Sequence, residues 1–129
     1  MEIPHRAALV AWLQADATLS ATLNSVTEEA PSRAAVPWLA ISASSSLDWS
    51  TKTETGYETR IALELQMRGD TPASGASLVA AIQNAIAALP RVQTGFRIVT
   101  LTFLRSRAEQ RANNTRAVLL EYRFRLIAA

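Results

Sequence analysis

The residues from 57 to 68 alternate between apolar and polar side chains without a break, and this pattern restricts the fold more than any other feature of the chain. The segment reads YETRIALELQMR. Successive side chains of a β-strand point to opposite faces, so this period predicts a strand with one buried face and one hydrated face. The predicted buried face carries Tyr57, Thr59, Ile61, Leu63, Leu65 and Met67. Such a sheet needs a second layer to cover its apolar side.

Two segments with helical periodicity can supply that layer. Residues 5–23 carry an apolar stripe that is broken near Asp16, which predicts one helix, a cap and a short further turn. The stripe consists of Leu9, Trp12, Leu13, Leu19 and Leu23. Residues 73–89 read ASGASLVAAIQNAIAAL, with apolar side chains spaced by one or two helical turns, and Pro90 ends the pattern.

Three more segments favour strands. Residues 38–43 are a short apolar run, and the polar stretch that follows them to residue 56 is typical of a loop. In residues 94–105 and in residues 117–127, apolar and polar side chains alternate. The apolar positions of the first segment are Val99, Leu101 and Phe103. Those of the second segment are Val118, Leu120, Tyr122, Phe124 and Leu126. The order α-β-β-α-β-β predicts an α+β fold, a four-stranded antiparallel sheet with two helices packed on one face, in a single domain over residues 1–129.

The composition is that of a globular domain, and we expect it to be cytosolic. Hydrophobic residues make up 49% and charged residues 19% of the 129 residues, and a chain of this length buries roughly two thirds of its unfolded surface. The absence of Cys excludes disulfides, thiolate metal sites and a cysteine nucleophile. No apolar run approaches the roughly 20 residues of a membrane helix. With 13 basic and 11 acidic residues, net charge alone does not argue for nucleic acid.

No arrangement typical of catalysis is present. The single histidine, His5, lies beside a predicted helix start and is expected to face solvent, and the chain contains no phosphate-binding glycine motif and no nucleophile elbow. The acidic pairs Glu28–Glu29 and Glu58/Glu64 are most simply explained as surface charge. We therefore expect no enzyme, no cofactor and no metal site.

The second face of the sheet holds the candidate contact residues. It would display a mixed ladder of charge that includes Arg60 and Arg68, with Ile98, Leu104 and Leu119 interspersed. Two interpretations stay open: a solvated surface whose opposite charges pair across strands, and a polar interface between subunits. Trp49, in a polar loop, is the tryptophan expected to be free for a partner.

The segment RSRAEQRANNTR, residues 105–116, is predicted to connect the last two strands. It carries Arg105, Arg107, Arg111 and Arg116 against the single Glu109. A connector of this length is commonly functional or disordered, so we expect an extended arm that is mobile in the free subunit. Its partner could be DNA phosphate or acidic patches on adjoining subunits, and a nucleic-acid-binding domain is one alternative for the whole chain.

Five segments in order, ALVAWLQADATLSATL, VPWLAISASSS, YETRIALELQMRGD, ASLVAAIQNAIAAL and AVLLEYRFRLIAA, resemble the tail terminator (tail completion) proteins of long-tailed phages and related gene transfer agents. The resemblance spans nearly the whole chain. Relatives commonly carry a glycine and an Arg-Val pair where this chain has SVTEEAPSRAAV, residues 25–36.

The resemblance implies a non-enzymatic protein of the neck or tail of a virion or phage-like particle, assembled in the bacterial cytoplasm. Such proteins form a ring, usually of six subunits, that caps the tail tube, ends its growth and joins the head connector. The implied partners are other copies of the chain, the tail tube protein, the connector or stopper protein, and DNA that passes through the lumen without sequence-specific binding; no membrane is implied. Another neck component, such as a head-closure or connector subunit, is the alternative.

Overall fold

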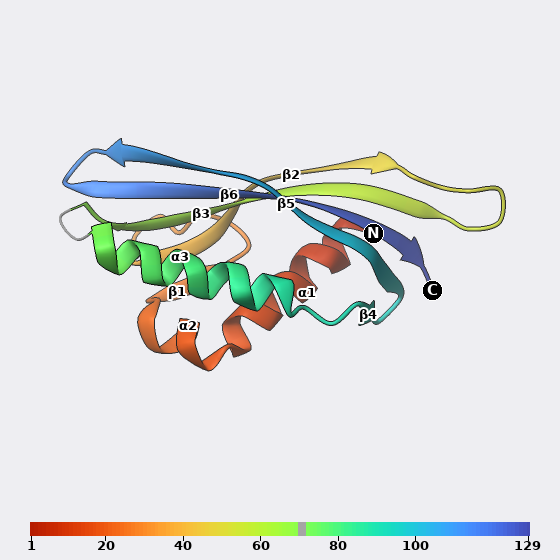
Figure 1. Ribbon diagram of the computed structural model, residues 1–129, viewed down its shortest axis with the longest axis horizontal. Helices are drawn as coiled ribbons and strands as arrows, with labels where there is room; N and C mark the ends of the chain where they lie inside the picture. The colour runs from red at the N-terminus through yellow and green to blue at the C-terminus, as the bar shows by residue number, and fades with distance from the viewer. Residues whose placement is uncertain (70–71) are drawn as a thin grey trace.

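The computed structural model describes residues 1–69 and 72–129 and consists of one twisted sheet with three helices on a single face (Figure 1). The helices are α1 (Glu2–Ala15), α2 (Ala17–Thr22) and α3 (Pro72–Ala87). The strands are β1 (Ser25–Thr27), β2 (Trp38–Asp48), β3 (Gly56–Arg68), β4 (Val92–Gln93), β5 (Phe96–Arg111) and β6 (Thr115–Ala128). Their order in the sheet is β1-β2-β3-β6-β5-β4.

The α+β class is confirmed, but the predicted four strands and two helices are too few. The long strands β2, β3, β6 and β5 are antiparallel neighbours, as expected. Two short strands extend this sheet: β1 pairs in parallel with β2, and β4 pairs with the start of β5. Strands of three and two residues are too short to show a periodic pattern, which is why the sequence did not reveal them.

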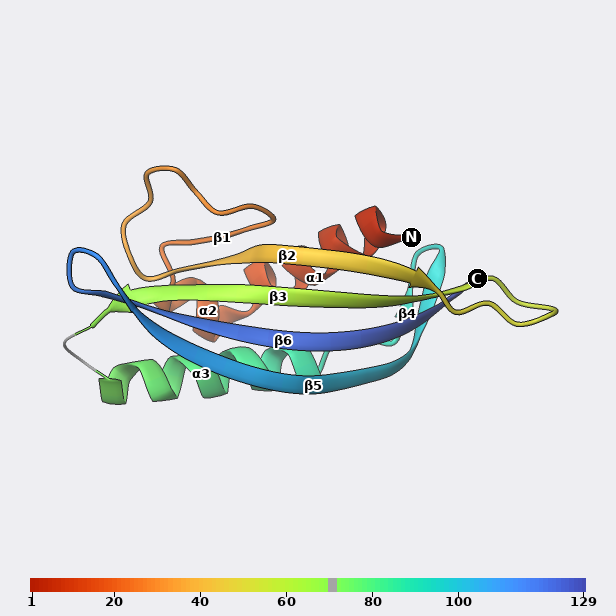
Figure 2. The same cartoon turned by 90° about the horizontal axis from the view of Figure 1, so that it is seen from above.

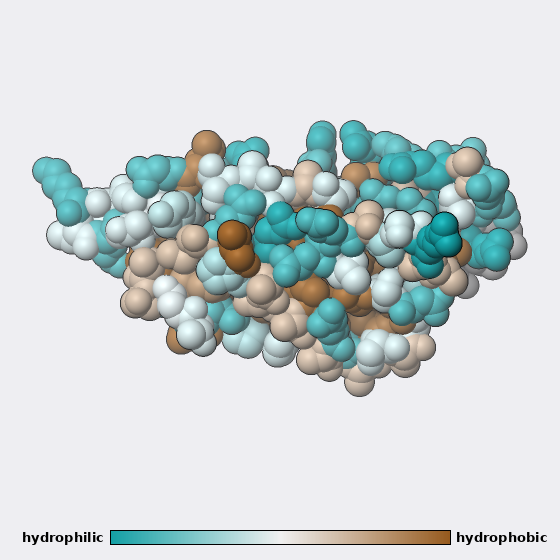
Figure 3. Space-filling model, turned by 180° about the vertical axis from the view of Figure 1, so that it is seen from behind, coloured by the Kyte–Doolittle hydropathy of each residue, from teal (hydrophilic) through white to brown (hydrophobic). Residues whose placement is uncertain are grey.

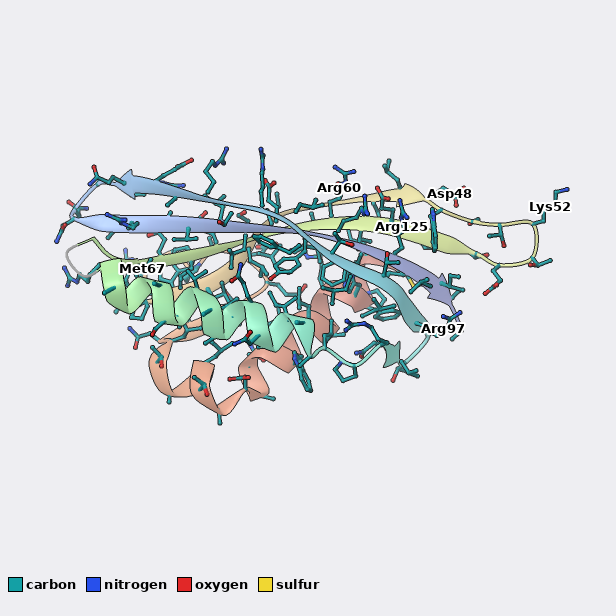
Figure 4. The ribbon with its side chains drawn as sticks, in the orientation of Figure 1. Asp48, Lys52, Arg60, Met67, Arg97 and Arg125 are labelled. Atoms are coloured by element: carbon teal, nitrogen blue, oxygen red, sulfur yellow. The ribbon has the colours of Figure 1, made fainter. Side chains whose placement is uncertain are left out.

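The two faces of β3 are as predicted. Leu63 is 1% exposed and packs under the sheet with Ile82 of α3, which is fully buried. Figure 4 shows Met67 on the helix side of β3 and Arg60 on the opposite side. The alternation of apolar side chains in β6 is also confirmed, because all five residues expected in the core are buried there.

Strand β5 departs from the predicted alternation because its pairing with β6 is irregular. The register shifts between Ile98 and Thr100 and again between Phe103 and Arg105. A β-bulge inserts an extra residue and reverses the faces that follow it. Ile98 lies before the first shift, so its phase is opposite to that of Leu101. Ile98, expected on the polar face, is therefore buried, whereas Val99, expected in the core, is 38% exposed.

His5 also differs from expectation, since it is completely buried instead of facing solvent. The first helix begins at Glu2, earlier than its apolar stripe suggests. His5 thus lies one turn before Leu9 on the same side of the helix, and that side packs against the sheet. Its ring lies between Phe96 and Phe124, at centroid distances of 5.9 and 4.4 Å.

The two chain ends lie in the same half of the molecule. Figures 1 and 2 both place them in the half that carries the β2–β3 loop, away from the turn between β5 and β6. The loop of residues 28–37 projects beside β2 in the other half (Figure 2). The long axis of the subunit therefore has two distinct ends.

Candidate assembly surface

The outward face of β5 and β6 is a ladder of ion pairs near the β5–β6 turn. Arg105 lies opposite Glu121 in the register, and its Nε and Nη2 both donate to that carboxylate, the second at 3.2 Å. Arg107 Nε lies 3.3 Å from Glu109 Oε1, and Arg111 Nη2 lies 3.0 Å from Glu109 Oε2. Three of the arginines proposed from the sequence thus have carboxylate neighbours, with Arg107 and Arg111 sharing Glu109 and Arg111 also lying 3.9 Å from Glu64.

The closest of these pairs changes the proton affinity of both partners. The hydrogen bond from Arg105 holds the pKa of Glu121 below its usual range, and the same bond raises the pKa of Arg105. The side chains are exposed, so this pairing is screened by water and salt. It orients charge on the surface more than it stabilises the fold.

A second charged cluster lies further along the same face, where Figure 4 shows Arg60 and Arg125, and Arg60 lines one pocket with Arg105 and Glu121. Glu58 lies between them, with its oxygens 3.6 Å from Arg60 Nε and 3.2 Å from Arg125 Nε. The Arg125 guanidinium lies over the Trp49 ring, 5.4 Å from its centroid. Trp49 is therefore half-buried and already has one cation on its ring.

The structure corrects the prediction of a twelve-residue connector at 105–116. Strand β5 continues to Arg111 and β6 begins at Thr115, so the turn contains only residues 112–114. Asn113 and Asn114 have φ values of 60° and 54°, a left-handed conformation that asparagine tolerates better than most residues. The segment expected to be a connector without secondary structure is instead a β-hairpin.

The hairpin also separates the four arginines. Arg105, Arg107 and Arg111 lie on the outward face, whereas Arg116 lies opposite Gln110 and lines a pocket with Met67 and Val79 on the helix side. Arg68, opposite Thr115, is exposed at the same end of the sheet. The alternation of faces within a strand causes this separation.

Two open sheet edges are the second feature of this surface, and an open four-stranded sheet of the predicted kind also has them. Strand β1 pairs with β2 only at residues 38–40, and β4 pairs with β5 only at Phe96 and Arg97. Within the described residues, the rest of both outer edges has no partner strand. An open edge presents backbone N–H and C=O groups that can pair with another chain. The subunit has one such edge on each side.

Beside the β5 edge, the sheet and α3 leave an apolar groove open. Two pockets of about 310 and 350 Å³ form it and meet at Gln83. We call this surface the α3–β5 groove; its lining includes Val79, Ala80, Leu101, Phe103, Tyr122 and Arg116. Burial raises the pKa of Tyr122 to about 12, so this phenol stays neutral across the ordinary pH range.

Figure 3 shows the molecule from behind, which is the side of β2 and the 28–37 loop. Polar side chains predominate along its sheet-side half (Figure 3).

Within residues 1–69 and 72–129, no group of three or more histidine or carboxylate side chains could hold a metal ion. Among the same residues, the helices are too short or too polar to cross a membrane.

A family model described as tail completion protein gp17 matches residues 7–127. The chain belongs to this family. It is thus a structural component of a phage-type tail. Among solved structures, a chain from the virion of a native gene transfer agent particle has the same fold, with a TM-score of 0.83 at 24% identity over 99% of this chain and 97% of that chain. No curated protein matches the sequence.

In this tail completion protein, the residues that the sequence singled out do not form one site. Arg68, Arg107 and Arg111 lie toward the β5–β6 turn, and Arg105 lines one pocket of the outward face together with Arg60. Trp49 lies beneath Arg125, and Arg116 lies on the helix side. Sequence reasoning missed the α3–β5 groove, although the exposed alanines Ala76, Ala80 and Ala87 on α3 were a signal for a helix side that is not fully covered.

Proposed function

We propose that this tail completion protein forms a six-membered ring that caps the tail tube, ends its polymerisation and joins it to the head connector. The two open edges carry the proposal. Any ring larger than a dimer needs two different complementary patches on each subunit. The outer edges of β2 and β5 lie at opposite sides of one sheet and can supply both.

The charge pattern supports a protein assembly more than a grip on nucleic acid. Arg105, Arg107 and Arg111 are paired with glutamates of the same subunit. A phosphate contact would have to compete with those carboxylates, so the free energy gained from counterion release would be smaller. DNA can then pass through the ring without sequence-specific binding, while the hairpin contacts adjoining subunits or the tube protein.

The chemistry of the surface is consistent with a non-enzymatic role in the particle, at the neck or tail. The glutamates of the outward face each lie within ion-pair distance of an arginine. A catalytic centre instead brings together groups with perturbed pKa values around a place for substrate. Contact with the tube protein and with the connector is therefore the proposed task of this surface.

Native mass spectrometry of the purified protein, with electron microscopy of tail tubes assembled with and without it, tests the proposal. We expect a closed multiple of the subunit mass, a ring at one end of each tube and longer tubes when the protein is absent. Monomers alone, together with uncapped tubes of unchanged length, would overturn it. A ring bound to the head vertex with no effect on tube length would instead indicate a connector subunit.

A further inference from the structure

The α3–β5 groove exposes apolar surface beside an open strand edge. Leu101 is half-buried and Phe103 is 42% exposed, and both lie against Tyr122 and the C-terminal half of α3. The other pocket has a floor of Met67 and Val118 beneath α3. Gly75 makes this close approach possible, because a Cβ there would stand 2.6 Å from Met67 Sδ. The groove is a formed concave surface between two rigid elements.

One charged group lines this apolar surface. Arg116 is half-buried in the groove, and its Nε is inaccessible to solvent and has no hydrogen-bond partner within the described residues. A buried donor without a partner costs free energy. Since Nε is shielded, a carboxylate delivered by a partner would pair with the guanidinium of Arg116 through its terminal nitrogens.

The loop of residues 28–37 lies on the opposite side of the subunit, beyond β2 (Figure 2). It combines small apolar residues with the adjacent carboxylates of Glu28 and Glu29. Both carboxylates are exposed; Glu28 lies 3.6 Å from Arg6 Nε, and Glu29 lines a shallow pocket that also includes Arg6. The loop therefore offers a short apolar surface together with a carboxylate.

We infer that, in the assembled ring, the 28–37 loop of one subunit docks into the α3–β5 groove of its neighbour and that Glu29 pairs with Arg116 across this contact. The inference rests on the ring of the proposed function and names the contact that builds it. The occupant is a second copy of this chain.

The placement of the two surfaces supports this occupant. In Figure 2, the loop lies beyond β2 and α3 lies beyond β5, in the same half of the long axis. In Figure 1, the loop lies below the sheet, on the side of the helices. A neighbour whose β2 edge lies beside the β5 edge of this subunit therefore holds its loop at the same position along the long axis as the groove, and on the same side of the sheet. Because the two surfaces differ, the contact is heterologous, as a ring requires.

A charge exchange tests the pairing. Glu29→Arg and Arg116→Glu should each raise the subunit concentration needed for half-maximal ring formation by about tenfold or more, because each leaves like charges facing in a partly desolvated contact. The double variant E29R/R116E should restore most of the loss. Lys52→Glu, an exposed change in the β2–β3 loop away from both surfaces, is the control for net charge. Each variant must keep the melting temperature of the wild type.

Cross-linking gives an independent measurement, because the natural chain has no cysteine. The pair Ala30→Cys and Ala80→Cys places one thiol on the loop and one on α3, both at exposed positions. Oxidation of the assembled double variant should give a ladder of covalent oligomers, whereas Ala30→Cys with Ala21→Cys, which lies on α2, should give none.

The results distinguish the docking from the ring itself. A ring that forms normally in all charge variants and gives no Ala30–Ala80 ladder would overturn the docking and leave the proposed function standing. A wild-type protein that forms no ring, alone or on tubes, would overturn both. Restoration by the double charge variant together with the ladder would establish the contact.

Discussion

The imidazole Nδ1 of His5 in α1 lies 3.0 Å from the hydroxyl oxygen of Thr59 in β3, and this hydrogen bond joins two completely buried side chains. The other ring nitrogen, Nε2, has no hydrogen-bond partner in the described part of the chain. A proton added to the neutral ring would place an unsolvated charge between Phe96 and Phe124. Burial accordingly lowers the pKa of His5 from 6.5 to about 4.

The stability of the subunit should fall on mild acidification because of His5. Between pH 6.5 and about 4, the unfolded chain binds a proton at this residue and the native chain does not. The free energy of unfolding therefore decreases as the pH falls through this window, by roughly 3 kcal/mol in total. Urea melts of the wild type and of His5→Leu between pH 4 and 7 measure it. We expect the stability difference between the two proteins to change over the window; parallel curves would contradict the assignment.

Truncation of a core side chain should destabilise the fold strongly, whether that side chain belongs to the sheet or to a helix. Leu63 and Ile82 are 1% and 0% exposed, so Leu63→Ala and Ile82→Ala should each cost about 2 to 5 kcal/mol in denaturant melts. Leu47→Ala is the matched control, since Leu47 is 62% exposed and its loss should stay within about 0.5 kcal/mol. Near-neutral effects at Leu63 and Ile82 would mean that the assigned faces are inverted.

The outward hairpin arginines should matter for assembly and little for folding. Replacing Arg105, Arg107 and Arg111 with Ser removes exposed ion pairs, and such pairs contribute little to stability. The melting temperature should stay nearly unchanged, while ring formation or tube capping weakens. Arg97→Ser, an exposed change near the other end of β5, is the control. Normal capping with altered DNA retention would place the arginines at the lumen, and no change in either would indicate a purely solvated surface.

The predicted part of the fold comes from strands with one buried face. In β3 and β6, burial of alternate side chains against the helices imposes a two-residue period that is visible in the sequence. The end of β5 has no such constraint: Arg105, Ser106, Arg107 and Ala108 are all exposed, so both faces tolerate polar residues. This is why the segment resembled a loop.

The sequence predicted that the candidate site is a charged face of the sheet, but it did not predict where each of the site residues lies. The charged outward face followed from the alternation in β3, and it includes Arg60 as expected. The side on which Arg116 lies depends on where the turn begins, and the sequence did not show that Asn113 and Asn114 make it so short. The groove results from how far β5 extends beyond α3. Such relations between elements leave no periodic signal.

The position of the two chain ends makes them useful markers for electron microscopy. Both lie away from the β5–β6 turn (Figures 1 and 2), and rotation about a single axis keeps every copy of a point at one height. A compact tag fused to either end would therefore appear as one tier of density. Comparing that tier with density from a tag inserted at Ala112 would show which end of the subunit faces the tube and which faces the head.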